Sequence, residues 1–359
     1  MIGEFFNSER KAINQEIEHF FDKLNKKEKE LLFADFNSQL RTFIIPEKSK
    51  AKRIHPILLV AAFNGIINPI YLEDNIEEIR KVAIAVEFLH SGHLIHDDLI
   101  DNDDIRRGEP AFHKQLQNEI NKVYKTLDIS EKGKLIELYG RDLSILGGTL
   151  GYLLGLDIIR ASKFPDQLKL LAINEYTEAM DYLLKGMIIE EYMEYHKITM
   201  TLEQYLNIAE MQRARVLEKA TKIGAILARG NRHYQIKPLS EAMLKIGQAY
   251  AIRDDILDIE EDIKDKKKKF LYILAVQNTN EEQSRLLNEL YRKPDITKSD
   301  INDVVKIFAE TNATIIAEHF SKGLIQEAKE YLRKIYPDLN REQKEFFNEF
   351  SDFIYLREF

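Results

Sequence analysis

The sequence predicts an all-α protein built as one domain, and three observations lead to this prediction. Apolar residues recur every three to four positions along most of the chain, which is the period of an amphipathic helix. No stretch shows the sustained alternation of apolar and polar residues that a half-buried strand requires. No run rich in glycine, serine or proline divides the 359 residues into separate parts. We therefore expect about a dozen helices joined by short loops, in a single domain that spans 1–359.

The helical pattern can be followed from one end of the chain to the other. Near the start, one predicted helix face consists of Ile13, Ile17, Phe20 and Leu24. Asn75, followed three residues later by Glu78, has the form of a capping box, so a long helix is expected from there toward His96. Near the end, the same spacing returns in Phe346, Phe350, Phe353 and Ile354. Helix breakers separate the periodic segments at 68–69, 107–110, 164–165 and 336–337.

The composition excludes several classes of chemistry. The chain has 52 Lys and Arg against 60 Asp and Glu, a formal charge of −8, whereas a non-specific nucleic-acid-binding domain would be basic. Cysteine is absent, so disulfides, thiolate nucleophiles and cysteine-ligated metal sites are excluded. Any reaction must then depend on carboxylates, histidines and basic side chains.

Neither a signal peptide nor a membrane span is expected from the sequence. The first residues, MIGEFFNSERK, lack a basic start followed by an apolar stretch. The longest uncharged run, 143–156, has 14 residues, fewer than the ~20 that cross a bilayer. We expect a cytoplasmic protein with no transmembrane segment.

Two aspartate clusters carry the strongest functional signal. The pattern D-D-x-x-D occurs at 97–101 and again at 254–258, each time after an apolar helical segment. Residues four apart share one helix face, so Asp97 would lie beside Asp101, and Asp254 beside Asp258. An exposed acidic helix face is the ordinary explanation for one such cluster, but chance gives only about 0.1 of them in a chain of this composition.

Divalent magnesium would compensate the repulsion within each cluster. Mg²⁺ prefers oxygen ligands and binds through one or two carboxylates together with water and substrate phosphates. Arg106 and Arg107 follow the first cluster, and arginine presents a fork of donors that matches phosphate oxygens. A basic patch upstream, also suited to phosphate, contains Lys48, Lys50, Lys52, Arg53 and His55. A second charged block, acidic at 260–265 and basic at 266–269, is expected to be a solvated loop.

These motifs resemble those of the trans-isoprenyl diphosphate synthases, the polyprenyl synthetase family that includes farnesyl and geranylgeranyl diphosphate synthases. The stretch from Asp97 to His113 is similar to the family's first aspartate-rich motif with its R-R-G-x-P-x-x-H continuation, and 254–258 resembles the second. Further matches lie at 90–96, 186–190, 212–224 and 355–357. The resemblance implies an all-α, single-domain isoprenoid synthase fold with helices around a central cavity, usually homodimeric.

The resemblance also implies an activity: Mg²⁺-dependent, head-to-tail condensation of isopentenyl diphosphate with an allylic diphosphate. Three magnesium ions with substrate bound would be expected. The implied metal ligands are Asp97, Asp98, Asp101, Asp254 and Asp258. The implied catalytic residues are these five together with Asp255, and Asp255 and Asp258 would support the other four. Arg106 would contact the allylic diphosphate, and the implied isopentenyl diphosphate site consists of Lys52, Arg53, His90 and Arg107.

Several positions depart from the family pattern. The last arginine of its G-G-K-R-x-R-P signature is His55, which can still donate to phosphate but whose charge depends on pH. Met187 replaces the glutamine of G-Q-x-x-D, and Ala251 replaces that of the F-Q pair. The family's K-T pair corresponds to Gln212-Arg213. The positive charge is therefore one residue later than in the family pattern, which is roughly 100° around a regular helix. Lys267 is assigned as the lysine after the second cluster, and residues 114–140 look like an insertion.

In the family, residues just upstream of the first cluster form the floor of the product pocket. The corresponding positions here are Phe88, Leu89, Gly92 and His93. A glycine at the nearest position would leave space for a product of C20, geranylgeranyl diphosphate, or somewhat longer, although close packing between helices explains Gly92 equally well.

Two alternatives remain. The altered positions favour a non-catalytic or weakly active regulatory subunit of a heteromeric synthase, in which case the dimer would be hetero rather than homo. A class I terpene cyclase shares the fold, but cyclases generally carry a differently composed second metal motif.

Overall fold

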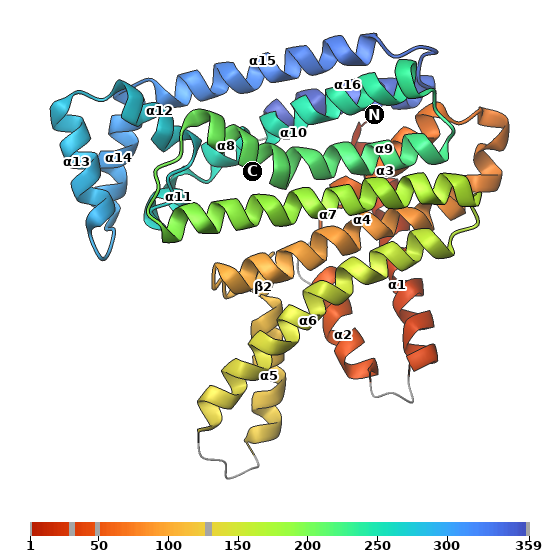
Figure 1. The fold of residues 1–359 in the computed structure, drawn as a ribbon, viewed down its shortest axis with the longest axis horizontal. Helices are drawn as coiled ribbons and strands as arrows, with labels where there is room; N and C mark the ends of the chain where they lie inside the picture. The colour runs from red at the N-terminus through yellow and green to blue at the C-terminus, as the bar shows by residue number, and fades with distance from the viewer. Residues whose placement is uncertain (1, 29–32, 47–50, 126–130, 357–359) are drawn as a thin grey trace. The chain divides into compact units, whose positions relative to one another are not determined.

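The structure is a computed structural model that describes residues 2–28, 33–46, 51–125 and 131–356. The predicted all-α class is confirmed, because the described residues form strands only at β1 (Ile105–Arg106) and β2 (Glu109–Pro110), a two-residue antiparallel pair (Figure 1). The contacts divide the chain into two compact units, and each is described by itself.

The first unit contains residues 3–180 and 223–229. Its helices are α1 (Ile2–Glu28), α2 (Ala34–Ile44), α3 (Ile54–Ile66), α4 (Leu72–Ile100), α5 (Phe112–Tyr124), α6 (Lys132–Ala161) and part of α7 (Asp166–Tyr195), with a short 3-10 helix, η2 (Pro69–Tyr71). Helix α4 is the core element, because it packs against α3 and α6 and is apolar and buried almost all round from Ile79 to Ile95. A helix that is apolar on every side needs neighbours on every side.

Glycines allow α6 to approach α4 closely. A side chain added at Gly148 would meet the carbonyl of Gly92 at 2.9 Å, and one added at Gly155 would meet the carbonyl of Ala85 at 2.7 Å. Of the described helices, α6 is the one that is long and apolar enough to cross a membrane by length and composition. Its packing on α4 is what a core helix of a folded domain shows.

The second unit contains residues 181–222 and 230–359. Its helices are the rest of α7, α8 (Leu202–Ala209), the π-helix η3 (Glu210–Ala214), part of α9 (Arg215–Leu227), the π-helix η4 (Arg232–Ile236), α10 (Lys237–Leu257), α11 (Ile259–Lys264), α12 (Phe270–Asn278), α13 (Glu281–Arg292), α14 (Lys298–Glu310), α15 (Ala313–Arg333) and α16 (Arg341–Leu356). Helix α10 is the core of this unit and packs against α15, α16 and η3.

Two local predictions were wrong. Helix α4 begins at Leu72 rather than at Asn75, because η2 leads directly into it; the Asn75 amide donates to the Tyr71 carbonyl, and Glu78 accepts from the backbone of Lys163. The charged block at 260–269 is not simply a solvated loop. Its acidic half forms α11, and Lys266 Nζ donates to the carbonyls of Lys293 and Pro294, where α13 ends.

The predicted insertion 114–140 forms the end of α5 and the start of α6, as far as the structure describes it. The two helices pack against each other, and the Tyr139 hydroxyl donates to Glu119 at 3.1 Å. The breakers predicted at 164–165 and 336–337 lie between helices, and Asn68 and Pro69 begin η2 between α3 and α4. The stretch 107–110 forms the turn of the strand pair and its second strand.

Candidate functional site

The first aspartate cluster lies at the C-terminal end of α4. Asp97 and Asp98 belong to its last turn and Asp101 is the residue that caps it. Asp98 points inward and is 0% exposed, whereas Asp97 is partly exposed and Asp101 exposed. Neighbours in sequence are about 100° apart on a helix, while residues four apart share a face. The outer face therefore carries Asp97 and Asp101, as the sequence predicted.

Arg106 holds the buried member of this cluster. Its Nε donates to Asp98 Oδ1 at 2.5 Å, and its NH2 group lies 3.5 Å from Asp97 Oδ2 and 3.4 Å from Asp103 Oδ2. Burial raises the pKa of Asp98 to about 6, and the hydrogen bond from Arg106 opposes this rise. Asp98 Oδ2 is buried and has no hydrogen-bond partner in the described part of the chain. One oxygen of the buried carboxylate therefore lacks a donor.

A tight turn brings Arg107 to a second group of polar residues. Arg107 and Gly108 both have positive φ, at 56° and 76°, which is the two-residue turn that joins β1 to β2. Arg107 NH2 lies 3.9 Å from the Glu87 carboxylate, which is buried in the middle of α4. Burial opposes ionisation of Glu87, but the positive charges of Arg53, Arg107 and His55 together hold its pKa below the usual value.

Arg53 lies deeper than expected for a substrate ligand. It begins α3 with φ of 58° and is 3% exposed. Its Nε donates to Asn14 Oδ1 at 2.8 Å, NH2 donates to the Ile44 carbonyl at 2.8 Å, and NH1 pairs with Glu87. Each of the three guanidinium nitrogens therefore has a protein partner, and Arg53 joins α3 to α4.

His55 and His90 meet beside this ion pair. Their ring centroids are 4.5 Å apart, with His55 on α3 and His90 one turn after Glu87 on α4. Lys52, just before α3, is exposed. Lys48 and Lys50 of the predicted basic patch lie outside the described residues. The structure thus brings His55, His90 and Arg107 together around Glu87, as far as the predicted isopentenyl diphosphate site can be followed.

The second aspartate cluster, in the other unit, repeats the arrangement of the first. It lies at the C-terminal end of α10, with Asp258 as the capping residue. Asp255 is buried, whereas Asp254 is partly exposed and Asp258 exposed. Asp255 Oδ2 accepts hydrogen bonds from the Tyr205 hydroxyl at 2.6 Å and from the Phe270 backbone at 3.0 Å. In each cluster the second aspartate is thus fixed inside the protein and the first and third remain outside.

Lys269 brings positive charge to this cluster. Lys269 Nζ lies 2.8 Å from Asp262 and 3.9 Å from Asp255, while the Lys267 side chain is exposed. Burial raises the pKa of Asp255 to about 6, and the Lys269 charge opposes this rise. In the sequence, Lys269 is the last lysine before the apolar segment that forms α12. That position is the feature from which its contact with the cluster could have been predicted.

Gln212 and Arg213 lie on the π-helix η3, not on a regular helix. A π-helix has more residues per turn than an α-helix, so neighbouring side chains are separated by a smaller angle. The displacement of 100° expected from the sequence therefore does not apply to Arg213. Gln212 Nε2 donates to Glu190 at 2.7 Å, and Arg213 is exposed. The acid at 190 and the amide at 212 thus form one pair that joins α7 to η3.

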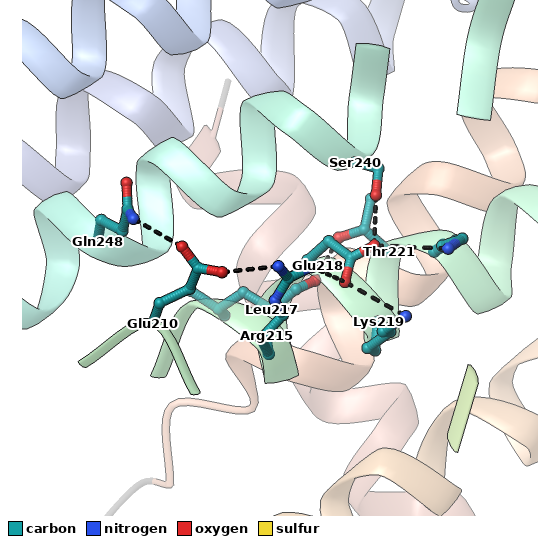
Figure 2. Close-up of polar contacts among 9 residues, drawn as sticks. Glu210, Arg215, Leu217, Glu218, Lys219, Thr221, Ser240 and Gln248 are labelled. Carbon is teal, nitrogen blue, oxygen red and sulfur yellow. Dashed lines mark hydrogen bonds and ion pairs between the residues drawn. The ribbon is translucent and has the colours of Figure 1, made fainter. Parts of the chain in front are cut away.

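A polar network anchors the π-helix at both ends (Figure 2). Glu210, its first residue, accepts from Gln248 on α10 at 2.9 Å and from Arg215 at 2.6 Å. About two turns after Glu210, on α9, the buried Glu218 accepts a hydrogen bond from Ser240 and lies 3.7 Å from Lys219. The backbone of the π-helix also packs closely against α10. A side chain added at Gly247 of α10 would lie only 2.3 Å from the Cα of Ala214.

The residues expected to floor the product pocket are buried in α4. Phe88 stacks edge-on against Phe20 at a centroid distance of 4.9 Å, and Leu89 and His93 are also buried. Gly92 does not leave open space at its missing side chain. A Cβ there would lie 2.6 Å from the Gly148 carbonyl oxygen and 3.2 Å from the Tyr152 ring. Close helix packing, the alternative explanation from the sequence, is what the structure shows at Gly92.

The donor chemistry of the clusters fits magnesium that is completed by phosphate. In the part of the chain that the structure describes, no three His, Asp or Glu side chains converge on one metal position. Each cluster instead exposes two carboxylates, and Mg²⁺ commonly takes one or two carboxylates with phosphate oxygens and water. The unpartnered Asp98 Oδ2 is a further oxygen that lacks a donor.

Comparison with known proteins agrees with these motifs. The family model described as polyprenyl synthetase matches residues 43–308, which include both aspartate clusters. The chain belongs to the polyprenyl synthetase family.

Relatives in the polyprenyl synthetase family differ in product. The chain is 28% identical over 298 residues to the short chain isoprenyl diphosphate synthase of Methanocaldococcus jannaschii, covering 80% of this chain and 76% of that protein. It is 26% identical over 332 residues to the geranylfarnesyl diphosphate synthase of Aeropyrum pernix, covering 86% of this chain and 91% of that protein. It is 25% identical over 317 residues to the geranylgeranyl diphosphate synthase of Methanosarcina mazei, covering 86% of each.

A solved structure confirms the isoprenoid synthase fold. The geranylgeranyl pyrophosphate synthase of Corynebacterium glutamicum, in complex with isoprenyl diphosphate and magnesium, superimposes with a TM-score of 0.86 at 20% identity. The match covers 98% of this chain and 99% of that chain. At this identity the likeness establishes the fold alone.

Sequence reasoning missed two polar residues of this polyprenyl synthetase. Glu87 is the single acid within the apolar run from 82 to 89, and that isolation is a usable signal. Tyr205 approaches Asp255 only through the fold of the second unit, and no spacing in the sequence relates the two. Asp262 belongs to the acidic block already noted in the sequence and lies four residues after Asp258.

Proposed function

We propose that the protein is a Mg²⁺-dependent, head-to-tail prenyltransferase that acts as one polyprenyl synthetase domain over 1–359. It would condense isopentenyl diphosphate with an allylic diphosphate to a linear trans-prenyl diphosphate of C20 or somewhat longer. The observation that carries the proposal is the repeated cluster, in which one aspartate is fixed inside and two carboxylates face outward. Relatives named as geranylgeranyl and geranylfarnesyl diphosphate synthases support the product range.

The contacts of the aspartates and of Arg106 indicate different roles for them. Asp97, Asp101, Asp254 and Asp258 would hold magnesium, which supplies positive charge to the departing diphosphate. Asp98 and Asp255 are better suited to positioning, because each is buried and hydrogen-bonded to a neighbour that organises its cluster. Arg106, held across the first cluster by Asp98, would bind the allylic diphosphate.

The second diphosphate would bind next to Glu87. The isopentenyl diphosphate would lie against Arg107 and, when protonated, His55 and His90, which surround Glu87 together with Arg53, with exposed Lys52 at the edge. Arginine and histidine both donate to phosphate oxygens. The isopentenyl double bond would then attack the allylic carbon as its bond to oxygen breaks, and the released proton can pass to diphosphate, so no dedicated side-chain base is needed.

Assembly as a homodimer and a cytoplasmic location form part of the proposal. Exposed apolar side chains on α6 and α7 of the first unit offer a surface for a second copy: Ile145, Leu146, Leu153, Leu170 and Leu171. Light scattering on the purified chain would give its mass directly. A monomer in solution would contradict this part of the proposal.

The test is incubation of the purified protein with labelled isopentenyl diphosphate and, separately, dimethylallyl, geranyl, farnesyl and geranylgeranyl diphosphates. We expect elongated linear products that disappear with a chelator and with Asp97→Ala. Asp303→Ala is the matched control, because Asp303 is an exposed aspartate of α14 outside both clusters. Product in the presence of excess chelator would contradict the magnesium requirement.

A regulatory subunit is the second candidate, because two polar positions of the family are filled by buried apolar residues, Met187 and Ala251. A folded protein that makes no product alone, but co-purifies with and stimulates an active homologue, would establish that alternative. Cyclic products from one allylic diphosphate would indicate a terpene cyclase instead.

A further inference from the structure

The loop between α11 and α12, residues 265–269, contains a lysine in a backbone conformation that favours glycine. Lys266 has a φ of 58°. Its N–H donates to the Ile263 carbonyl at 3.0 Å, and the N–H of Lys267 donates to the Asp262 carbonyl at 2.8 Å. These two hydrogen bonds form a Schellman motif at the end of α11, in which the left-handed residue is usually glycine because a Cβ is crowded there. The backbone of Lys266 is therefore strained.

The side chain of Lys266 ties this loop to the turn between α13 and α14. Its Nζ donates to the carbonyl oxygens of Lys293 and Pro294, to the latter at 2.8 Å. Lys293 ends α13, and the C-terminus of a helix carries carbonyls without intrahelical partners and a partial negative charge. An ammonium group donates to these carbonyls and is attracted by that charge. The strained lysine thus makes contacts that glycine could not make.

The turn that receives Lys266 is itself fixed by polar contacts. Lys293 Nζ donates to Asp300 Oδ1 at 2.6 Å, and Asp300 Oδ2 accepts from the backbone and the hydroxyl of Thr297 at 2.9 and 2.8 Å. Thr297 and Asp300 form the capping box that begins α14. Because the end of α13 is bonded to the start of α14 in this way, Lys266 has a firm anchor for the loop.

The same loop ends at the second aspartate cluster. Its last residue, Lys269, has its Nζ 2.8 Å from Asp262 and 3.9 Å from Asp255. The N–H of the next residue, Phe270, donates to Asp255 Oδ2 at 3.0 Å. Two contacts of the buried Asp255 thus come from the end of this loop, and a third comes from the Tyr205 hydroxyl. The position of the loop therefore helps to determine where Asp255 lies.

We propose that Lys266 is a positioning residue for the second aspartate cluster. It holds residues 265–269 on the end of α13 and thereby keeps Asp255 in place before magnesium binds. This inference rests on the proposed function, because it assigns magnesium to the outer carboxylates of this cluster. Lys266 acts through the loop and touches neither the metal nor the substrate. Ligands that are already in place bind more tightly, because less conformational entropy is lost on binding.

The test compares hydrogen exchange in the metal-free, full-length protein and its Lys266→Met, Lys266→Gly and Lys266→Arg variants. Methionine keeps the backbone strain and glycine relieves it, but both remove the ammonium group. In both, the amides of 265–270 should exchange about tenfold faster, the factor expected from the loss of a hydrogen bond to a charged group. Arginine can donate to the same carbonyls and should restore the wild-type rate. Lys268→Met is the matched control, because it removes the same charge from the same loop, where the Lys268 ammonium lies 5.6 Å from the centroid of the Tyr272 ring.

Magnesium binding gives a second measurement. Calorimetric titration of Mg²⁺ into the protein with inorganic diphosphate should show an affinity roughly threefold lower in Lys266→Met and restored in Lys266→Arg. The Mg²⁺ concentration for half-maximal activity should rise by the same factor, while kcat at saturating Mg²⁺ stays unchanged.

Unchanged exchange in Lys266→Met, faster exchange without a change in Mg²⁺ affinity, or equal effects in Lys268→Met would overturn the inference and leave the proposed function intact. Absence of any elongated product from the wild type would overturn the proposed function. The exchange rates and the Mg²⁺ titration do not depend on turnover, so they would still decide whether Lys266 holds the loop and the cluster in place.

Discussion

Arg53 and Glu87 form an ion pair in which both side chains are 1% exposed. The pair joins the start of α3 to the middle of α4, and Arg53 adds hydrogen bonds to Asn14 and to the Ile44 carbonyl. A charge inside a protein is tolerated only when its partner and its hydrogen bonds are present. The architecture of the proposed isopentenyl diphosphate site therefore depends on this buried ion pair.

Glu87→Gln should destabilise the protein by about 3–5 kcal/mol, because the Arg53 charge would then be buried without its partner. Chemical denaturation measures this free energy of unfolding. Glu18→Gln is the matched control, since it breaks an ion pair with Arg41 whose side chains are 36% and 44% exposed and should cost under about 1 kcal/mol. Equal losses in the two variants would show that burial of the Arg53 pair has no energetic consequence.

Gly92→Ala should destabilise the protein by about 1–3 kcal/mol, because the new Cβ meets the Gly148 carbonyl oxygen at 2.6 Å and two helices must separate. Gly323→Ala makes the same chemical change in α15, where no atom lies within 4 Å of the added Cβ. It should stabilise by about 0.5–1 kcal/mol, because alanine loses less backbone entropy in a helix. Thermal unfolding of the two variants measures whether each substitution raises or lowers the stability. A loss of stability in Gly323→Ala would contradict the packing described for this glycine.

Asp98 should make the metal-free protein more stable at mildly acidic pH. Its folded pKa of about 6 lies above the value of roughly 3.9 in an unfolded chain, so the folded state binds the proton more tightly. Stability gained by protonation is present below about pH 4 and is lost as pH rises through 6. Relative to Asp98→Asn, the wild type should therefore gain about 2 kcal/mol of stability between pH 7.5 and pH 4.5.

Asp300 provides a control of opposite sign. Hydrogen bonds from Lys293 and Thr297 lower its pKa to about 2, so its contribution is present at neutral pH and is lost as pH falls from 4 toward 2. Relative to Asp300→Asn, the wild type should become less stable over that range. Identical pH dependence for the wild type and Asp98→Asn above pH 4 would refute the raised pKa of Asp98.

Gln212→Lys should lower the KM for the allylic diphosphate by roughly tenfold, about 1.4 kcal/mol of binding. The lysine would place a cation beside Glu190, where the amide now donates a hydrogen bond, and cations attract diphosphate. Arg213→Gln tests whether the neighbouring arginine has taken over that function, in which case KM should rise. Steady-state kinetics with both variants distinguishes the two outcomes, and an unchanged KM in each would show that η3 does not contact the substrate.

Much of the candidate site could be predicted from the sequence because its parts are local. Helical spacing alone places Asp97 with Asp101 and Asp254 with Asp258, and the structure keeps them on the outer faces of α4 and α10. The R-G dipeptide at 107–108 forms the turn expected of it, since both residues adopt positive φ. These features depend on residues within a few positions of one another.

Distant segments decide the surroundings of several of these residues. Arg53 belongs to a basic patch in the sequence, and only the fold brings Glu87, 34 residues away, into an ion pair with it. Four lysines follow one another at 266–269, and only the fold places Lys269 beside Asp262 and Asp255. At Gly92 the sequence allowed either open space or close packing, and the contact with α6 decides for close packing.

The sequence by itself determined the all-α class, the two carboxylate clusters and the family, because helical periodicity and motif spacing are written over short stretches of chain. The tertiary structure alone decided which aspartate of each cluster is buried, which cations are already neutralised, and which side chain lies against Gly92. The physical reason is that burial and pairing depend on neighbours from other helices. Those neighbours set the charge that a residue can hold and the space that a substrate can enter.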